Sequence, residues 1–73
     1  MKFSVVIDGE RRVVTTRAGL RNVSRALVGA VVEAGASDLI GTAHEAAVRM
    51  ADGLSGYAAT IGGRERLRVA LLD

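Results

Sequence analysis

Hydrophobic residues recur every three or four positions from Leu20 to Asp52, which is the spacing expected for one face of an α-helix. A break at Gly35-Ala36-Ser37 divides this stretch into two halves, because Gly35 suits the left-handed residue that follows a helix and Ser37 suits an N-cap. We therefore expect two amphipathic helices joined by a short turn. Their predicted apolar faces consist of Leu20, Val23, Leu27, Val31 and Ala34, and of Leu39, Ala43, Ala47, Met50 and Leu54.

The end of the second helix allows two interpretations. The apolar spacing continues to Ile61, which would give one long helix capped by Gly62. Against this, Gly53 and Gly56 lie within the continuation, and each costs about 1 kcal/mol relative to Ala in a helix. The interpretation that we favour ends the helix with Gly53 in the left-handed conformation and makes Tyr57 to Ile61 a short strand.

Strand signals flank the helical stretch on both sides. Residues 2–16 are rich in β-branched side chains and contain Asp8-Gly9, a dipeptide typical of a two-residue hairpin turn. Gly62-Gly63 marks a second turn, after which residues 66–72 alternate between polar and apolar side chains. This alternation predicts that one face of the last strand carries Leu67, Val69 and Leu71, and that the other carries Arg66, Arg68 and Ala70.

The predicted order of elements is ββααββ, or ββααβ if the long helix is correct. Either order is typical of a two-layer α+β fold, in which an antiparallel sheet packs against two helices. With 73 residues and 49% hydrophobic side chains, the chain is expected to form one small globular domain over residues 1–73.

The composition favours self-association. A chain of this length buries only about 60% of the surface that its unfolded state exposes, and without Cys no disulfide can add stability. Because oligomerisation commonly supports such small cores, we expect a homo-oligomer. The candidate self-association residues are a stripe of small side chains, which would let another helix approach closely, and one apolar residue at a strand end: Ala26, Ala30, Ala34 and Leu72.

Neither a signal peptide nor a membrane span is predicted. The apolar run Phe3 to Ile7 is too short for the core of a signal peptide. The longest apolar run, Ala26 to Val32, has seven residues, whereas a membrane helix needs about 20. We therefore expect a cytoplasmic protein with no membrane partner.

The sequence offers few candidates for catalysis or metal binding. Ser37, Asp38 and His44 are the residue types of a nucleophilic triad. Ser37 and His44, however, are seven helical positions apart, about 10 Å along the axis and beyond hydrogen-bond reach. Asp38, Glu45 and Asp52 repeat at the same spacing and cannot share one ion. We expect no catalytic residue, no metal ligand, no cofactor and no small-molecule substrate.

Arginine is the feature that indicates a partner, since the chain has nine Arg, one Lys and a net charge of +2. Three arginines repeat every four positions in the first helical stretch, and three others alternate along the last strand. If both sets face the same side, they form a basic surface suited to carboxylates or phosphates. These residues are Arg17, Arg21, Arg25, Arg64, Arg66 and Arg68.

These observations predict a small non-enzymatic interaction protein that self-associates and binds an acidic protein surface, as a regulatory adaptor or inhibitor. The alternative is a protein that binds double-stranded nucleic acid through its arginine-rich face. Single-strand binding is disfavoured because the chain has one Phe, one Tyr and no Trp for base stacking. The second helix is a poor DNA-recognition helix, because Asp38, Glu45 and Asp52 would face the phosphates.

Overall fold

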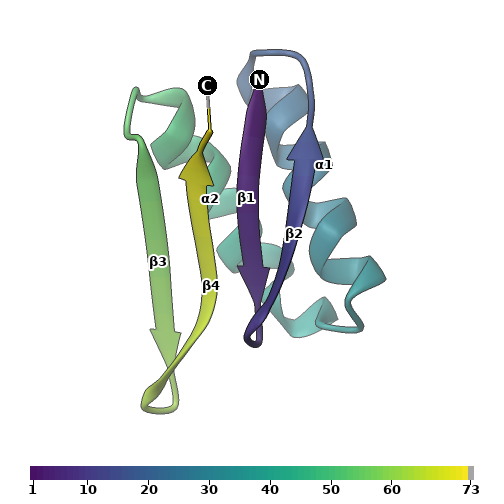
Figure 1. Cartoon of the computed structure of the whole chain (residues 1–73), viewed down its shortest axis with the longest axis vertical. Coiled ribbons are helices and arrows are strands. Elements are labelled where there is room, and N and C mark those ends of the chain that lie inside the picture. The colour runs from purple at the N-terminus through teal and green to yellow at the C-terminus, as the bar shows by residue number, and fades with distance from the viewer. Residues whose placement is uncertain (73) are drawn as a thin grey trace.

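The computed structural model describes residues 1–72 and contains one four-stranded antiparallel sheet and two α-helices (Figure 1). The predicted α+β fold with the order ββααββ is confirmed, and the longer-helix alternative is wrong because the second helix ends before Asp52. The elements in chain order are β1 (Lys2–Ile7), β2 (Glu10–Thr15), α1 (Leu20–Glu33), the 3₁₀ turn η1 (Ser37–Leu39), α2 (Ile40–Ala51), β3 (Gly56–Ile61) and β4 (Arg64–Leu71).

Two tight hairpins connect the strands in pairs. The β1–β2 turn places Asp8 at φ 49° and Gly9 at φ 87°, and the β3–β4 turn places Gly62 at 64° and Gly63 at 81°. Positive φ at both central residues defines a type I′ turn, whose twist matches that of the flanking strands. The two dipeptides therefore fix the ends of both hairpins, as the sequence predicted.

Both helices end in the same backbone motif. In α1 the amide of Gly35 donates to the carbonyl of Val32, and the amide of Ala36 donates to that of Val31 at 2.8 Å. Equivalent bonds follow α2, where Gly53 has φ 93°. This is a Schellman ending with glycine at the left-handed position, which explains why α2 does not continue into residues 53–56.

Neither helix begins with a side-chain cap, although Ser37 was predicted to cap the second helix. Ser37 makes no capping hydrogen bond and instead begins η1, which leads into α2. Helix α1 likewise begins without a side-chain cap, after Gly19 at φ 110°. The polar side chains nearest this end, Thr16 and Asn22, hydrogen-bond to neighbouring carbonyls and not to the free amides of the first turn.

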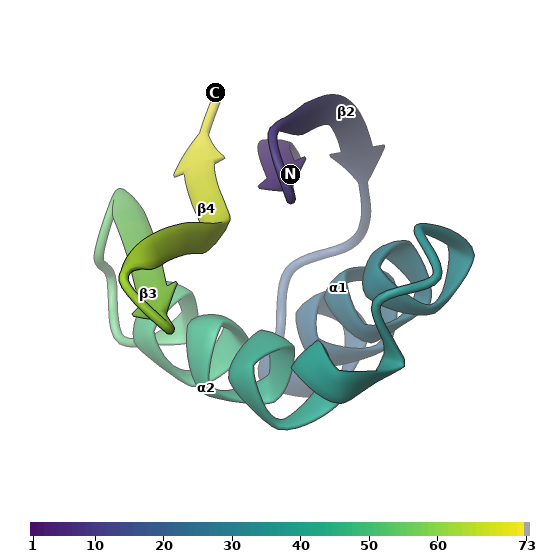
Figure 2. The ribbon, with the colours of Figure 1, turned by 90° about the horizontal axis from the view of Figure 1, so that it is seen from below.

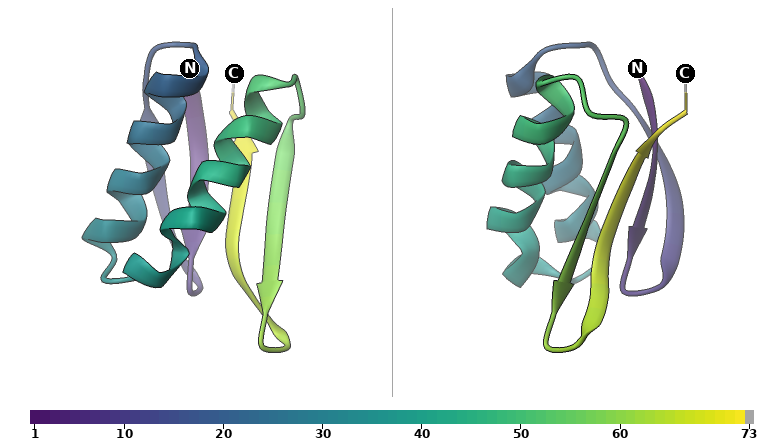
Figure 3. Two further views of the ribbon diagram at one scale, coloured as in Figure 1. Left: turned by 180° about the vertical axis from the view of Figure 1, so that it is seen from behind. Right: turned by 90° about the vertical axis from the view of Figure 1, so that its left-hand side faces the viewer.

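The strand order is β2-β1-β4-β3, so the first and last strands are central and β2 and β3 form the two edges. Both helices cover one face of this sheet and leave the other face open, as Figure 2 and the two views of Figure 3 show. The start of β1 and the end of β4 lie at the same end of the sheet (Figure 1).

The core lies between the sheet and the helices. Of the predicted apolar positions, Leu20 and Leu54 are exposed, because Leu20 is the first residue of α1 and Leu54 follows the end of α2. The buried core residues are Phe3, Val5, Ile7, Val23, Leu27, Ala30, Val31, Ala36, Leu39, Ala43, Ala46, Ala47, Met50, Leu67 and Val69.

Candidate functional site

A shallow groove runs along the solvent side of the two helices. It has a volume of about 610 Å³ and is lined mostly by apolar surface. Five of its residues come from α1 and one comes from α2, so it lies between these two helices, which are side by side in Figure 3 (left). We call it the helix groove, and its residues are Leu20, Arg21, Ser24, Arg25, Val28 and His44.

A hydrogen bond between Ser24 and His44 joins the two helices at this groove. The Ser24 Oγ and the His44 Nδ1 lie 2.9 Å apart. The apolar spacing of the helices did not predict this pair, although Ser24 lies eleven residues before Gly35 and His44 nine after it. Residues nearly equidistant from the turn of an antiparallel helix pair are neighbours, so this spacing is the signal that could have revealed the contact.

The arginines beside the helix groove are exposed. Arg21 and Arg25 lie one helical turn apart on α1, as predicted, whereas Arg17 precedes the helix and belongs to the connection from β2. Within residues 1–72, none of these three guanidinium groups forms an ion pair with a carboxylate. Arg21 and Arg25 therefore provide free positive charge next to the apolar surface of the groove.

The other three predicted arginines lie elsewhere, so the structure does not form one six-arginine face. Arg17 follows the end of β2 that pairs with Lys2, whereas Arg64 begins β4 after the turn at the opposite end of the sheet. Arg68 pairs with Val6 and stands between the buried Leu67 and Val69, so it lies on the face of the sheet that the helices leave open. Its guanidinium group bonds the Glu65 carboxylate at 2.6 and 2.7 Å.

Arg66 does not continue the predicted alternation of Arg64 and Arg68. Ala59 of β3 pairs with Leu67, but Thr60 pairs with Glu65, so Arg66 is an extra residue in the ladder. Such a β-bulge redirects a side chain. Here it directs Arg66 toward the helical layer, where its side chain is 15% exposed.

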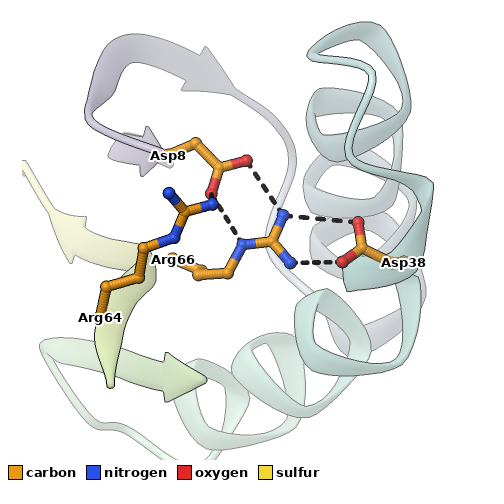
Figure 4. A network of polar contacts seen from close by, with 4 residues as sticks. All are labelled: Asp8, Asp38, Arg64 and Arg66. Carbon is orange, nitrogen blue, oxygen red and sulfur yellow. Dashed lines mark hydrogen bonds and ion pairs between the residues drawn. The ribbon is translucent and has the colours of Figure 1, made fainter. Parts of the chain in front are cut away.

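The Arg66 guanidinium group binds two carboxylates from different elements (Figure 4). Its Nε and Nη2 donate to Asp8 at 2.8 and 3.0 Å, and its Nη1 and Nη2 donate to Asp38 of η1. Arg64 adds a weaker pair with Asp8 at 3.7 Å. These bonds lower the pKa of both carboxyl groups below their ordinary value. The network therefore joins the β1–β2 turn, β4 and the start of the second helix.

The three alanines of the predicted self-association stripe differ in how far they are buried. Ala30 is buried in the core, and Ala26 and Ala34 are half-buried. Ala26 and Ala30 line a second groove, between α1 and β2, into which Arg12 extends to within 3.5 Å of the Ala30 carbonyl. A second helix therefore cannot use Ala30 as a contact without opening the core.

Leu72 is 45% exposed, as predicted for an apolar residue beyond a strand end. It does not mark an edge of the sheet, because β4 lies between β1 and β3. The Leu72 amide donates to the Lys2 carbonyl at 2.8 Å, so the backbone here is already paired with β1.

The structure separates the residues of the hypothetical triad, since His44 contacts Ser24 and Asp38 binds Arg66. Among residues 1–72, no three His, Cys, Asp or Glu side chains are grouped to hold a metal ion. In the same part of the chain, no helix is long and apolar enough to span a membrane. No protein-family model, curated protein or solved structure matches this chain.

Proposed function

We propose that this chain is a small non-enzymatic interaction protein that binds an acidic segment of another protein in the helix groove. The observation that carries the proposal is the combination of an apolar surface with two adjoining arginines that have no carboxylate partner in residues 1–72. Guanidinium groups bind carboxylates strongly and directionally. The partner that satisfies both features has apolar and acidic side chains on one surface.

An amphipathic helix is the form of acidic segment that fits best. Arg21 and Arg25 are four residues apart, about 6 Å along α1. Carboxylates spaced three or four residues apart on a partner helix have a similar separation. Leucine-like side chains on the adjoining stripe would then contact Leu20 and Val28. Helix-in-groove recognition of this kind uses such apolar anchors.

Duplex nucleic acid fits less well. That alternative depended on six arginines on one face, and Arg64, Arg66 and Arg68 are instead directed elsewhere and bonded to Asp8, Asp38 and Glu65. A phosphate backbone also has no counterpart for the apolar lining of the helix groove. Tight and steeply salt-dependent binding to a duplex would nevertheless replace the present proposal.

Fluorescence anisotropy with a labelled helical peptide, patterned with Leu on one face and Glu beside it, tests the proposal. The variant Arg21→Gln/Arg25→Gln should weaken binding roughly tenfold or more, because two charge-assisted contacts are lost. A matched control, Arg11→Gln/Arg64→Gln, removes the same net charge outside the groove and should bind like the parent. Equal loss in both variants, no peptide binding, or stronger binding to duplex DNA would contradict the proposal.

A further inference from the structure

The two edge strands of the sheet differ in whether they carry side chains that prevent pairing with another strand. An edge strand leaves a row of backbone N–H and C=O groups open, and proteins commonly protect it with charges, proline or inward-pointing charged side chains. Strand β2 carries Glu10, Arg11 and Arg12, and Arg12 points inward opposite Val5. This edge is therefore protected by charge.

Strand β3 has none of these protections. Its six residues, Gly56–Ile61, contain no charge and no proline. The extra residue of the bulge in this hairpin is Arg66 of β4, so β3 runs through the irregularity without an insertion of its own. Figures 1 and 3 show β3 at the margin of the sheet, with no segment along its outer side.

From this asymmetry we infer that β3 pairs antiparallel with the β3 of a second copy, which joins two sheets into one of eight strands. A two-fold interface of this kind uses the same patch on both copies and closes after two. Opposite residues must lie on the same face of the sheet. Centring the pairing on Ala59 meets this requirement and places Tyr57 opposite Ile61, and Ala58 opposite Thr60, of the other copy.

The composition of this edge suits a second copy of the chain. Without charge on β3, the two-fold brings no like charges into contact. Ile61 is 44% exposed in the single chain, and in this register it gains a cross-strand contact with an aromatic ring. Gly56, Ala58 and Ala59 leave room for close approach of the two backbones.

The neighbouring helix adds matching charges. Glu45 and Arg49 of α2 form an ion pair at 3.3 Å, and both influence the pKa of Tyr57, so they lie on the side of α2 next to β3. Each copy therefore brings one cation and one anion to this margin, which is a self-complementary arrangement. This margin is separate from the helix groove, whose residues lie on the line between α1 and α2.

Sedimentation equilibrium on paired charge variants tests this inference. The parent chain should show a monomer–dimer equilibrium between micromolar and millimolar concentration. Ala58→Glu/Thr60→Glu and Ala58→Lys/Thr60→Lys each place like charges opposite one another twice across the two-fold, and each should weaken dimerisation roughly tenfold or more. An equimolar mixture of the two variants should dimerise again. Far-UV circular dichroism verifies that each variant is folded.

Two comparisons separate repulsion between copies from repulsion within one chain. The neighbours on β4 are Arg68 beside Ala58 and Glu65 beside Thr60, so the two variants create different repulsions within one chain but the same repulsion between copies. The control Val13→Glu/Thr15→Glu adds two charges to exposed positions of β2 and should dimerise like the parent. A monomeric parent at all concentrations, dimers in both variants, or loss of dimers in the β2 control would overturn the inference.

Discussion

The guanidinium group of Arg66 joins three parts of the chain that are distant in sequence. It bonds Asp8 in the first hairpin turn and Asp38 in η1, while its backbone belongs to the last strand. Sequence alternation assigned Arg66 to the same face as Arg68. The assignment was wrong because a bulge adds one residue to β4, and nothing in the local sequence specifies where a ladder takes up an extra residue.

Replacing Arg66 with Met tests the structural role of this network. The substitution keeps an apolar stem of similar length but leaves Asp8 and Asp38 without their main hydrogen-bond donor. We expect Arg66→Met to lower the Tm clearly more than Arg68→Met, because the Arg68 side chain is 58% exposed and its ion pair is with Glu65, three residues away on the same strand. Differential scanning calorimetry of both variants measures this, and equal Tm values would contradict the assigned role.

The same network predicts how stability depends on pH. The pKa values of Asp8 and Asp38 lie below their ordinary 3.8 because Arg66 hydrogen-bonds their carboxylates. As the pH is lowered, the unfolded chain therefore takes up protons on these two carboxyl groups before the folded chain does. The free energy of unfolding consequently decreases as the pH decreases. We expect a level profile above about pH 5 and a progressive decrease as the pH falls through the lowered pKa values.

Urea unfolding at a series of pH values measures this profile. The Arg66→Met variant is the control, since its Asp8 and Asp38 carboxyl groups should titrate closer to their ordinary pKa and its curve should be flatter in acid. Parallel curves for the parent and the variant would show that the two carboxylates do not gain their low pKa from Arg66.

At the scale of single elements, the positions where a helix ends or where the chain turns back in a hairpin were the most predictable. Glycines marked both helix ends and both hairpin turns because these sites require positive φ, which glycine adopts without strain. The helix beginnings were not predictable, since neither helix has a side-chain cap. Ser37 is instead the first residue of a 3₁₀ turn, whose last residue, Leu39, is buried in the core.

Two glycine substitutions with opposite expected signs test the assigned helix end and helix interior. Gly53→Ala forces a left-handed conformation on a residue with a Cβ and should lower the free energy of unfolding by about 1 to 2 kcal/mol. Gly29→Ala lies in the middle of α1, where a Cβ would meet no atom within 4 Å, and should raise it by up to about 1 kcal/mol. Chemical denaturation measures both, and a change of the same sign in both would contradict the assignment.

At the scale of the whole molecule, the sequence predicted the two layers, but it did not predict the strand order or which residues that order places on the surface together. The alternation and periodicity indicated an antiparallel sheet under two helices, whereas the strand order β2-β1-β4-β3 depends on contacts between the chain ends. That order puts Leu72 beyond a central strand and makes β3 an unprotected edge. It also separates Arg64 and Arg68 from Arg21 and Arg25, which sequence spacing alone could not show.

The helix groove is the surface on which the proposed function depends. Nuclear magnetic resonance titration of the uniformly ¹⁵N-labelled chain with the acidic helical peptide locates the binding surface residue by residue. We expect saturable shifts of the groove amides, with the amides of β1 and β4 unchanged; the groove amides are those of Leu20, Arg21, Ser24, Arg25, Val28 and His44. Shifts that cluster on the open face of the sheet, or a spectrum that the peptide leaves unchanged, would contradict the proposed function.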